Sequence, residues 1–137
     1  YKVFAEGKSL LNTPPTFAIY MVKLVTRWLL EEIGGLDKME QINKRKAQML
    51  YDVLDQSKGF YEAHAQPGSR SIMNVPFRLA RPELEEQFLK QAAEHGLREL
   101  QGHRSVGGCR ASIYNAMPIE GVQALRDFMI DFRDRHG

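Results

Sequence analysis

The chain has 137 residues, of which 43% are hydrophobic and 26% are charged, so one domain with a core that buries roughly two-thirds of the unfolded surface can form. The 19 Lys and Arg residues against 17 Asp and Glu give a net charge of +2, which excludes holding a polyanion by charge alone. A single cysteine excludes an intrachain disulfide, and charges interrupt the apolar stretches, so we expect no membrane span.

Residues 1–11 form a short mixed segment without a charged-then-apolar leader, so we expect a soluble intracellular globule, whole or part of a longer protein. The run Asn12-Thr13-Pro14-Pro15-Thr16 then predicts a helix start, because Asn and Thr are good N-caps and proline suits the first helical position. Gly34-Gly35 ends this helix. Its apolar residues recur on one face, namely Phe17, Tyr20, Met21, Leu24, Val25, Trp28 and Leu29.

A second amphipathic helix is predicted from about Asp37 to Gln56. The apolar spacing places one set of side chains inward: Met39, Ile42, Ala47, Met49, Leu50, Val53 and Leu54. The opposite face carries charges that we expect to be solvated: Lys44, Arg45, Lys46 and Asp52.

The rest of the chain alternates short strands with helices. Strands are predicted over residues 60–65, 71–79, 97–100 and 111–114, and helices begin at Pro82 and Pro118. Pro76 indicates a sheet edge or a bulge, because proline cannot donate to a central ladder. This order predicts a mixed α/β chain of the α+β type, a largely antiparallel sheet with helices packed on one face.

The segment Gly102–Arg110 is the first candidate for chemistry. It brings together His103, Arg104 and Arg110 around a diglycine that allows close backbone approach, and no acid lies between Gln101 and Asn115. The planar fork of arginine suits carboxylate and phosphate, so a small ligand bearing both anions fits. The alternative is a surface turn whose arginines pair with acids from elsewhere in the fold.

Asn12 and Thr13 are the second candidate, because a helix N-terminus attracts anions. The alternative, compatible with the first, is that they only cap the helix. Cys109 is expected to be a buried, inert thiol. The histidines lack metal-ligand spacing, so no metal site is expected.

Three blocks of the sequence resemble the phosphoserine aminotransferases: Asn12–Tyr20, Met73–Phe77 and Gly102–Met117. The resemblance continues through the final helix and implies the C-terminal domain of a fold-type I, pyridoxal-phosphate-dependent aminotransferase, a cytoplasmic homodimer. It implies exchange of an amino group between glutamate and 3-phosphohydroxypyruvate, giving 2-oxoglutarate and phosphoserine in serine synthesis, and a related step in vitamin B6 synthesis. Neither nucleic acid nor membrane is implied as a partner.

The resemblance also implies residue roles. Arg110 would hold the substrate α-carboxylate, and His103 and Arg104 would face the substrate phosphate. Asn12 and Thr13 would reach the cofactor phosphate of the neighbouring subunit.

The family's Schiff-base lysine lies upstream of the Asn-Thr-Pro-Pro segment, and neither Lys2 nor Lys8 sits in its context. We therefore expect no catalytic residue in this chain and no turnover by it alone. Residues 1–33 would be the tail of the large cofactor-binding domain with a connecting helix, and residues 34–137 the small domain. The alternative is a stand-alone, non-catalytic module that binds a phosphorylated carboxylic acid.

Overall fold

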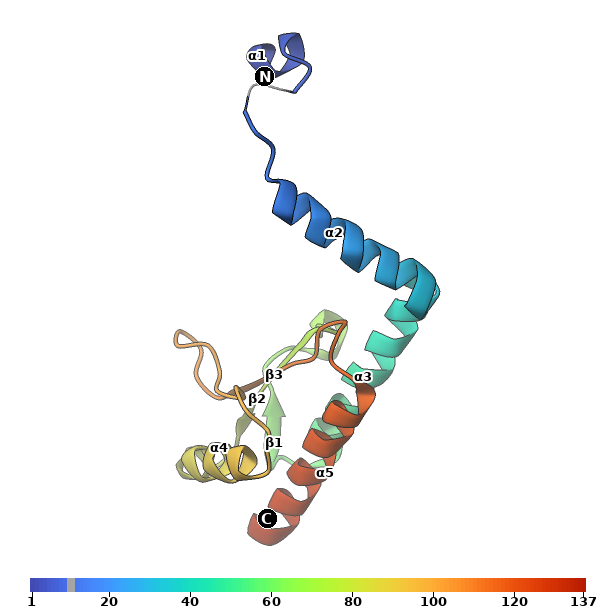
Figure 1. The fold of residues 1–137 in the computed structure, drawn as a ribbon. Coiled ribbons are helices and arrows are strands. Elements are labelled where there is room, and N and C mark those ends of the chain that lie inside the picture. Colours follow the sequence, from blue (N-terminus) through green and yellow to red (C-terminus); the bar gives the residue numbers. More distant parts are fainter. Residues whose placement is uncertain (10–11) are drawn as a thin grey trace. The chain divides into compact units, whose positions relative to one another are not determined.

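Two units, residues 1–39 and residues 40–137, make up the computed structural model, which describes residues 1–9 and 12–137. Leu10 and Leu11, the end of the mixed N-terminal segment, lie outside the described residues. The first unit contains the short helix α1 (Lys2–Glu6), the helix α2 (Thr16–Trp28) and a π-helical turn, η1 (Leu29–Ile33) (Figure 1).

Helix α2 begins at Thr16, later than the polar residues predicted to cap it. Pro15 occupies the capping position, no side chain caps the helix, and the first turn closes through Ile19 N–H donating to Pro15 O at 3.1 Å. The prediction that Asn12 and Thr13 cap the helix is therefore wrong, because the two prolines extend the chain between these residues and the first turn. The predicted end is confirmed, since Gly34 adopts the left-handed φ of 87° that terminates the helical run.

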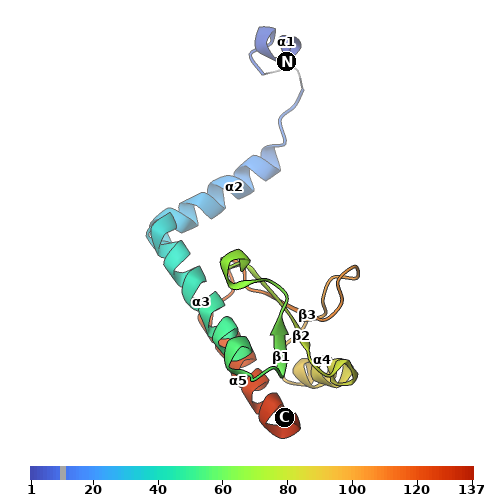
Figure 2. The ribbon, with the colours of Figure 1, turned by 180° about the vertical axis from the view of Figure 1, so that it is seen from behind.

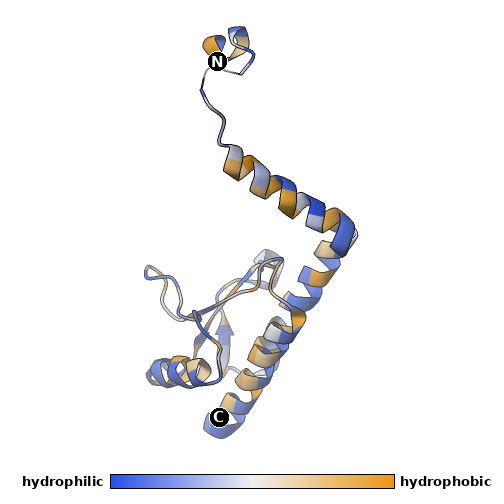
Figure 3. Ribbon diagram, viewed as in Figure 1, coloured by the Kyte–Doolittle hydropathy of each residue, from blue (hydrophilic) through white to orange (hydrophobic). Residues whose placement is uncertain are grey.

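The apolar face of α2 is solvent-exposed, although its spacing predicted an inward face. Phe17 is 77% exposed and Tyr20 is 53% exposed, and Trp28 is only half-buried. Figure 3 shows hydrophobic residues recurring along the length of this helix. The amphipathic pattern was predicted correctly, but no residue of α2 is buried.

The second unit carries the sheet and the remaining helices. The elements in chain order are α3 (Leu36–Gln56, which begins in the first unit), β1 (Tyr61–Ala63), η2 (Pro67–Ser69), β2 (Asn74–Leu79), η3 (Pro82–Leu84), α4 (Glu85–Glu94), β3 (Cys109–Ser112) and α5 (Ile119–His136). The three strands form an antiparallel sheet in the order β1-β2-β3 (Figure 2). The predicted α+β arrangement is confirmed.

The predicted strand over residues 97–100 is not a strand in the structure. Glu99 has a φ of 58°, which interrupts an extended run, and only the bridge between Gln101 and Cys109 remains. Leu100 O still accepts a hydrogen bond of 2.7 Å from Arg110 N–H, so this segment lies along the outer edge of β3. Strand β3 itself begins two residues before the predicted start at Ala111.

Pro76 lies in the central strand, so the prediction of a sheet edge is wrong. Its carbonyl accepts from His64 N–H at 3.3 Å, one residue beyond the end of β1 at Ala63. In an antiparallel strand the N–H and C=O of one residue point to the same side, so the missing N–H of Pro76 would face His64, and no return bond to the His64 carbonyl can form. The proline therefore limits this last pair between the two segments to one hydrogen bond, and β1 ends beside it.

One face of the sheet and the helices share a single core. Val75, Phe77 and Leu79 alternate inward along β2, as do Cys109 and Ala111 along β3. They meet an aromatic cluster from the two helices α4 and α5 and from β1, made of Tyr61, Phe88, Phe128 and Phe132 together with Phe77. The opposite sheet face is left free of this core, and it carries Arg110 and Ser112.

Helix α3 contributes most of its predicted inner residues to the buried set, but Met49 is only partly buried and Ile42 remains 37% exposed. The predicted solvated face is correct for Lys44 and Arg45 and wrong for Lys46, which is fully buried. Lys46 lies one turn from Leu50 on the buried side of the helix, and the lysine run in the sequence gave no indication of this.

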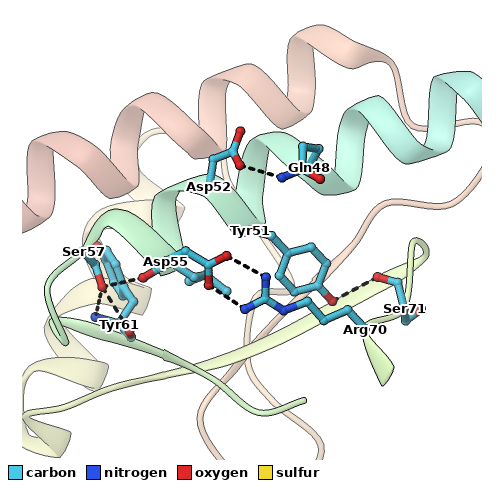
Figure 4. Close-up of polar contacts among 9 residues, drawn as sticks. Gln48, Tyr51, Asp52, Asp55, Ser57, Tyr61, Arg70 and Ser71 are labelled. Atoms are coloured by element: carbon cyan, nitrogen blue, oxygen red, sulfur yellow. Dashed lines mark hydrogen bonds and ion pairs between the residues drawn. The ribbon is translucent and has the colours of Figure 1, made fainter. Parts of the chain in front are cut away.

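A polar cluster on α3 fixes the turn before β2 (Figure 4). Arg70 donates to both carboxylate oxygens of Asp55, at 2.7 and 2.5 Å, and its guanidinium lies 4.5 Å from the centre of the Tyr51 ring. Tyr51 O–H donates to Ser71 O at 3.0 Å. Hydrogen bonds from Arg70 hold the pKa of the Asp55 carboxyl below its usual range.

This shift predicts a stability that depends on pH. Because the folded pKa of Asp55 is lowered, its contribution is present above the unfolded value of about 3.9 and is lost as the pH falls through the folded pKa. Asp55→Asn should reduce the free energy of unfolding at pH 7 by up to about 1 kcal/mol, since the carboxylate is half-exposed, and by progressively less below pH 4. Urea unfolding from pH 7 to pH 2.5 measures this. Asp52→Asn, whose described partner is Gln48, is the control, and a pH-independent deficit for Asp55→Asn would contradict the assignment.

Candidate functional site

A closed loop separates Gln101 from β3. Gly102 N–H donates to Gly108 O at 2.8 Å and forms the neck of the loop, and the N–H groups of Val106 and Gly107 both donate to His103 O at 2.8 Å. Residues 103–107 therefore form a tip whose backbone is held by its own hydrogen bonds.

The glycines of this segment are required by the loop itself. A Cβ on Gly102 would overlap Gly107 O, and one on Gly108 would lie 2.7 Å from Phe77 O. Gly107 and Gly108 also have φ values of 75° and 67°, in the region that favours glycine. The backbone freedom that suggested close approach to a ligand is thus accounted for by closure of the neck against β2.

The tip presents two of the three predicted cationic residues. His103 and Arg104 are exposed there, and His103 Nδ1 lies 2.7 Å from Ser105 Oγ. Arg78, on β2, reaches the same loop, where its Nη2 donates to Val106 O at 2.6 Å. Sequence reasoning did not single out Arg78. The signal was available in the strand alternation, which places it on the same sheet face as Pro76.

Arg110 lies at the base of the hairpin, apart from the tip residues along the chain. Its side chain is half-buried, and its Nε is buried without a hydrogen-bond partner. It lines a cavity of about 530 Å³ between residues 96–101, β3 and the start of α5. Among the described residues, no acid forms an ion pair with His103, Arg104 or Arg110, so the alternative of arginines neutralised within the fold finds no support.

Polar side chains lie on the same free face of the sheet as Arg110. Asn74 and Ser112 are opposite each other in the register, and Ser112 Oγ donates to Asn74 Oδ1 at 3.2 Å. Asn74 Nδ2 in turn donates to the Tyr114 hydroxyl at 3.1 Å. An unpaired guanidinium beside fixed amide and hydroxyl groups is an arrangement that can bind a carboxylate and orient the molecule that carries it.

Asn12 and Thr13, in the first unit, are exposed in the segment before α2. Their amide and hydroxyl groups are hydrogen-bond donors of the kind that a phosphate accepts, so the residues present fit the role of phosphate ligands. That role stays a prediction.

The remaining chemical candidates are inert in this structure. Cys109 is 1% exposed, and burial raises the pKa of its thiol to about 12, which confirms the predicted buried thiol.

Within residues 1–9 and 12–137, no three His, Cys, Asp or Glu side chains come together to hold a metal ion. No helix in this described part is both long and apolar enough to cross a membrane.

The family model of the class-V aminotransferases matches residues 1–125, and the chain belongs to this family. Among similar proteins, the phosphoserine aminotransferase of Acidithiobacillus ferrooxidans is 56% identical over the whole chain, and that of Lysinibacillus sphaericus is 54% identical over 99% of it. The chain spans 38% and 37% of the length of these two relatives.

Solved structures give the same likeness. A phosphoserine aminotransferase from Bacillus circulans subsp. alkalophilus matches with a TM-score of 0.91 and 50% identity, over 100% of this chain and 38% of that one. A phosphoserine aminotransferase from Trichomonas vaginalis, solved with pyridoxal phosphate bound, matches with a TM-score of 0.82 and 38% identity, over 95% of this chain and 37% of that one.

The neck of the loop is open to a direct test. Gly102→Ala should cost about 1–3 kcal/mol of stability, because the new methyl group overlaps the Gly107 carbonyl and forces the neck apart. Thermal unfolding and amide chemical shifts measure the effect, and the shifts should be confined to residues near 101–109. Gly68→Ala, where a Cβ meets nothing within 4 Å, is the matched control, and equal behaviour of the two variants would refute the steric argument.

Proposed function

We propose that this chain is the C-terminal part of a pyridoxal-phosphate-dependent phosphoserine aminotransferase, which transfers an amino group between glutamate and 3-phosphohydroxypyruvate. One observation carries the proposal: Arg110 is half-buried at a cavity, with a guanidinium that no acid of the described residues neutralises. A buried cation without a partner is costly, and a substrate carboxylate would compensate it. Glutamate, phosphoserine and both keto acids carry such a carboxylate.

In this proposal the residues of the chain bind and orient the substrate. Arg110 holds the α-carboxylate through parallel N–H···O bonds, which fixes the direction of the adjacent carbon. His103 and Arg104, at the exposed tip, bind the phosphate of the phosphorylated substrates. The fold supports separate binding of the carboxylate and the phosphate, because the neck between Gly102 and Gly108 separates the tip from the strand that carries Arg110.

Pyridoxal phosphate, when bound, supplies the carbonyl group that takes up and returns the amino group and the ring that stabilises charge at the substrate carbon. Asn12 and Thr13 would donate hydrogen bonds to its phosphate in the neighbouring subunit. The lysine that anchors the cofactor and moves the proton is assigned to polypeptide that precedes this chain, where residues 1–33 would be the tail of the large domain.

A homodimer in the cytoplasm follows as part of the proposal, with a second activity in vitamin B6 synthesis. The apolar face of α2 supports association with further polypeptide, because an exposed row that includes Phe17, Tyr20 and Val25 is unfavourable in water. Residues 34–137 would then be the small domain of each subunit.

The proposal is tested by comparing this chain with a full-length polypeptide that contains it. The full-length protein, loaded with pyridoxal phosphate, should convert 3-phosphohydroxypyruvate to phosphoserine with glutamate as the donor. The isolated chain should give no pyridoxamine form above the rate of free cofactor, as followed by absorbance. Tight binding of phosphoserine by the isolated chain, together with no activity of the full-length protein, would favour a stand-alone binding module instead.

Arg110→Lys in the full-length protein should weaken binding of glutamate and of the keto acids by about 1.5–3 kcal/mol, because the charge remains and the two-pronged hydrogen bonding is lost. Steady-state KM values for each substrate measure the effect. Arg45→Lys, an exposed arginine on α3, is the control and should leave KM unchanged. An unchanged KM for glutamate in Arg110→Lys would remove the central support of the proposal.

Arg104→Ala should raise KM for the phosphorylated substrates about tenfold or more and that for glutamate less than about threefold, because only the former present a dianion to the tip. Arg104→Lys keeps a cation there and should show a smaller selective loss. Substrate-specific kinetics in the full-length protein measure both. An equal rise in KM for the two substrate classes would contradict the proposal that the tip binds the phosphate and Arg110 the carboxylate.

A further inference from the structure

Lys46 is the one lysine among the described residues whose side chain is fully buried. Its Nζ donates three hydrogen bonds, to Ile113 O at 3.1 Å, Tyr114 O at 2.7 Å and Met117 O at 3.1 Å. An ammonium group has three donors, so every one is used, and backbone carbonyl dipoles take the place of a carboxylate. Burial lowers the pKa of Lys46, because the charged form loses its hydration.

The three carbonyls belong to one turn, which joins β3 to α5. Met117 N–H donates to Tyr114 O at 2.9 Å and closes the turn, while Ile113 N–H donates to Met73 O at 2.9 Å and ties its beginning to the segment before β2. Lys46 therefore joins both ends of this turn to α3 through a single atom. Arg110 lies three residues before the first of these carbonyls.

A second contact from α3 reaches the same turn. Asn43, 3% exposed and one helical turn before Lys46, donates from Nδ2 to Asn115 Oδ1 at 2.8 Å. Two side chains of α3 thus hold the turn: Lys46 binds its backbone carbonyls and Asn43 binds the side chain of Asn115. All of these residues lie within the second unit, residues 40–137.

The turn also forms a wall of the cavity at Arg110. Ile113 and Met117 line this cavity together with Arg110 and Ser112. A shift of the turn would therefore move both the cavity wall and the end of the strand that presents the guanidinium. Positioning of a bidentate ligand is sensitive to displacements on the order of 1 Å.

We propose that Lys46 is a positioning residue for the substrate carboxylate, acting through the turn 113–117 and not by contact with the substrate. This inference rests on the proposed role of Arg110. It also assigns the buried lysine a function other than cofactor attachment, because all of its donors are engaged and its side chain is enclosed.

The test compares Lys46→Met with Lys44→Met in the full-length, cofactor-loaded protein. The substitution is the same in both, and Lys44 is an exposed lysine on α3 that pairs with Glu40 at 2.8 Å. Lys46→Met should raise KM for glutamate at least tenfold, with kcat of the folded enzyme changed less than threefold. It should also accelerate amide hydrogen exchange at Ile113 and Met117. Lys44→Met should change neither KM nor this exchange.

The split between KM and kcat separates positioning from general stability, since partial unfolding lowers the active fraction without moving KM. A KM within twofold of the wild-type value in folded Lys46→Met overturns the inference. Where Lys46→Met yields too little folded protein, the KM for glutamate is measured in Lys46→Gln, which retains an amide donor, and the same twofold criterion applies. If Arg110→Lys also leaves KM unchanged, the proposed function fails, whereas a failure of Lys46 alone leaves that function standing.

Discussion

The pairing of β3 with β2 is the constraint on which both the core and the site depend. Side chains alternate along a strand, so a register that buries Cys109 and Ala111 against the helices must turn Arg110 and Ser112 to the free face. A slip of one residue would bury the guanidinium and expose the core. The position of Arg110 on the free face is therefore specified by the same register that forms the hydrophobic core.

Both ends of this short strand are held by contacts outside the sheet. Before β3, the neck between Gly102 and Gly108 closes the loop and leaves no room for a side chain at either glycine. After β3, Lys46 holds the turn by three carbonyls. A strand of four residues has few ladder bonds of its own, so these restraints at its ends help to fix the position of Arg110, as its proposed role requires.

In the first unit, the apolar face of α2 is exposed. Helix α2 has a regular amphipathic sequence and a defined end at Gly34, yet none of its residues is buried. Local sequence is enough to form the helix, whereas burial of its apolar face requires a partner surface. The chain spans 38% of the length of the Acidithiobacillus ferrooxidans relative.

The sequence by itself determined the order of the four longer helices and most strands, the inward apolar residues of the second unit and the cationic segment Gly102–Arg110, because these follow from periodicity, proline and glycine positions and composition. It could not place Pro76 in a central strand, since that depends on where the neighbouring β1 ends. Nor could it show that Glu99 interrupts an extended segment, that Arg78 reaches the loop, or that Lys46 is enclosed. These properties were decided only by the tertiary structure, because they arise from contacts between residues far apart in the chain. A local sequence pattern does not identify such contacts.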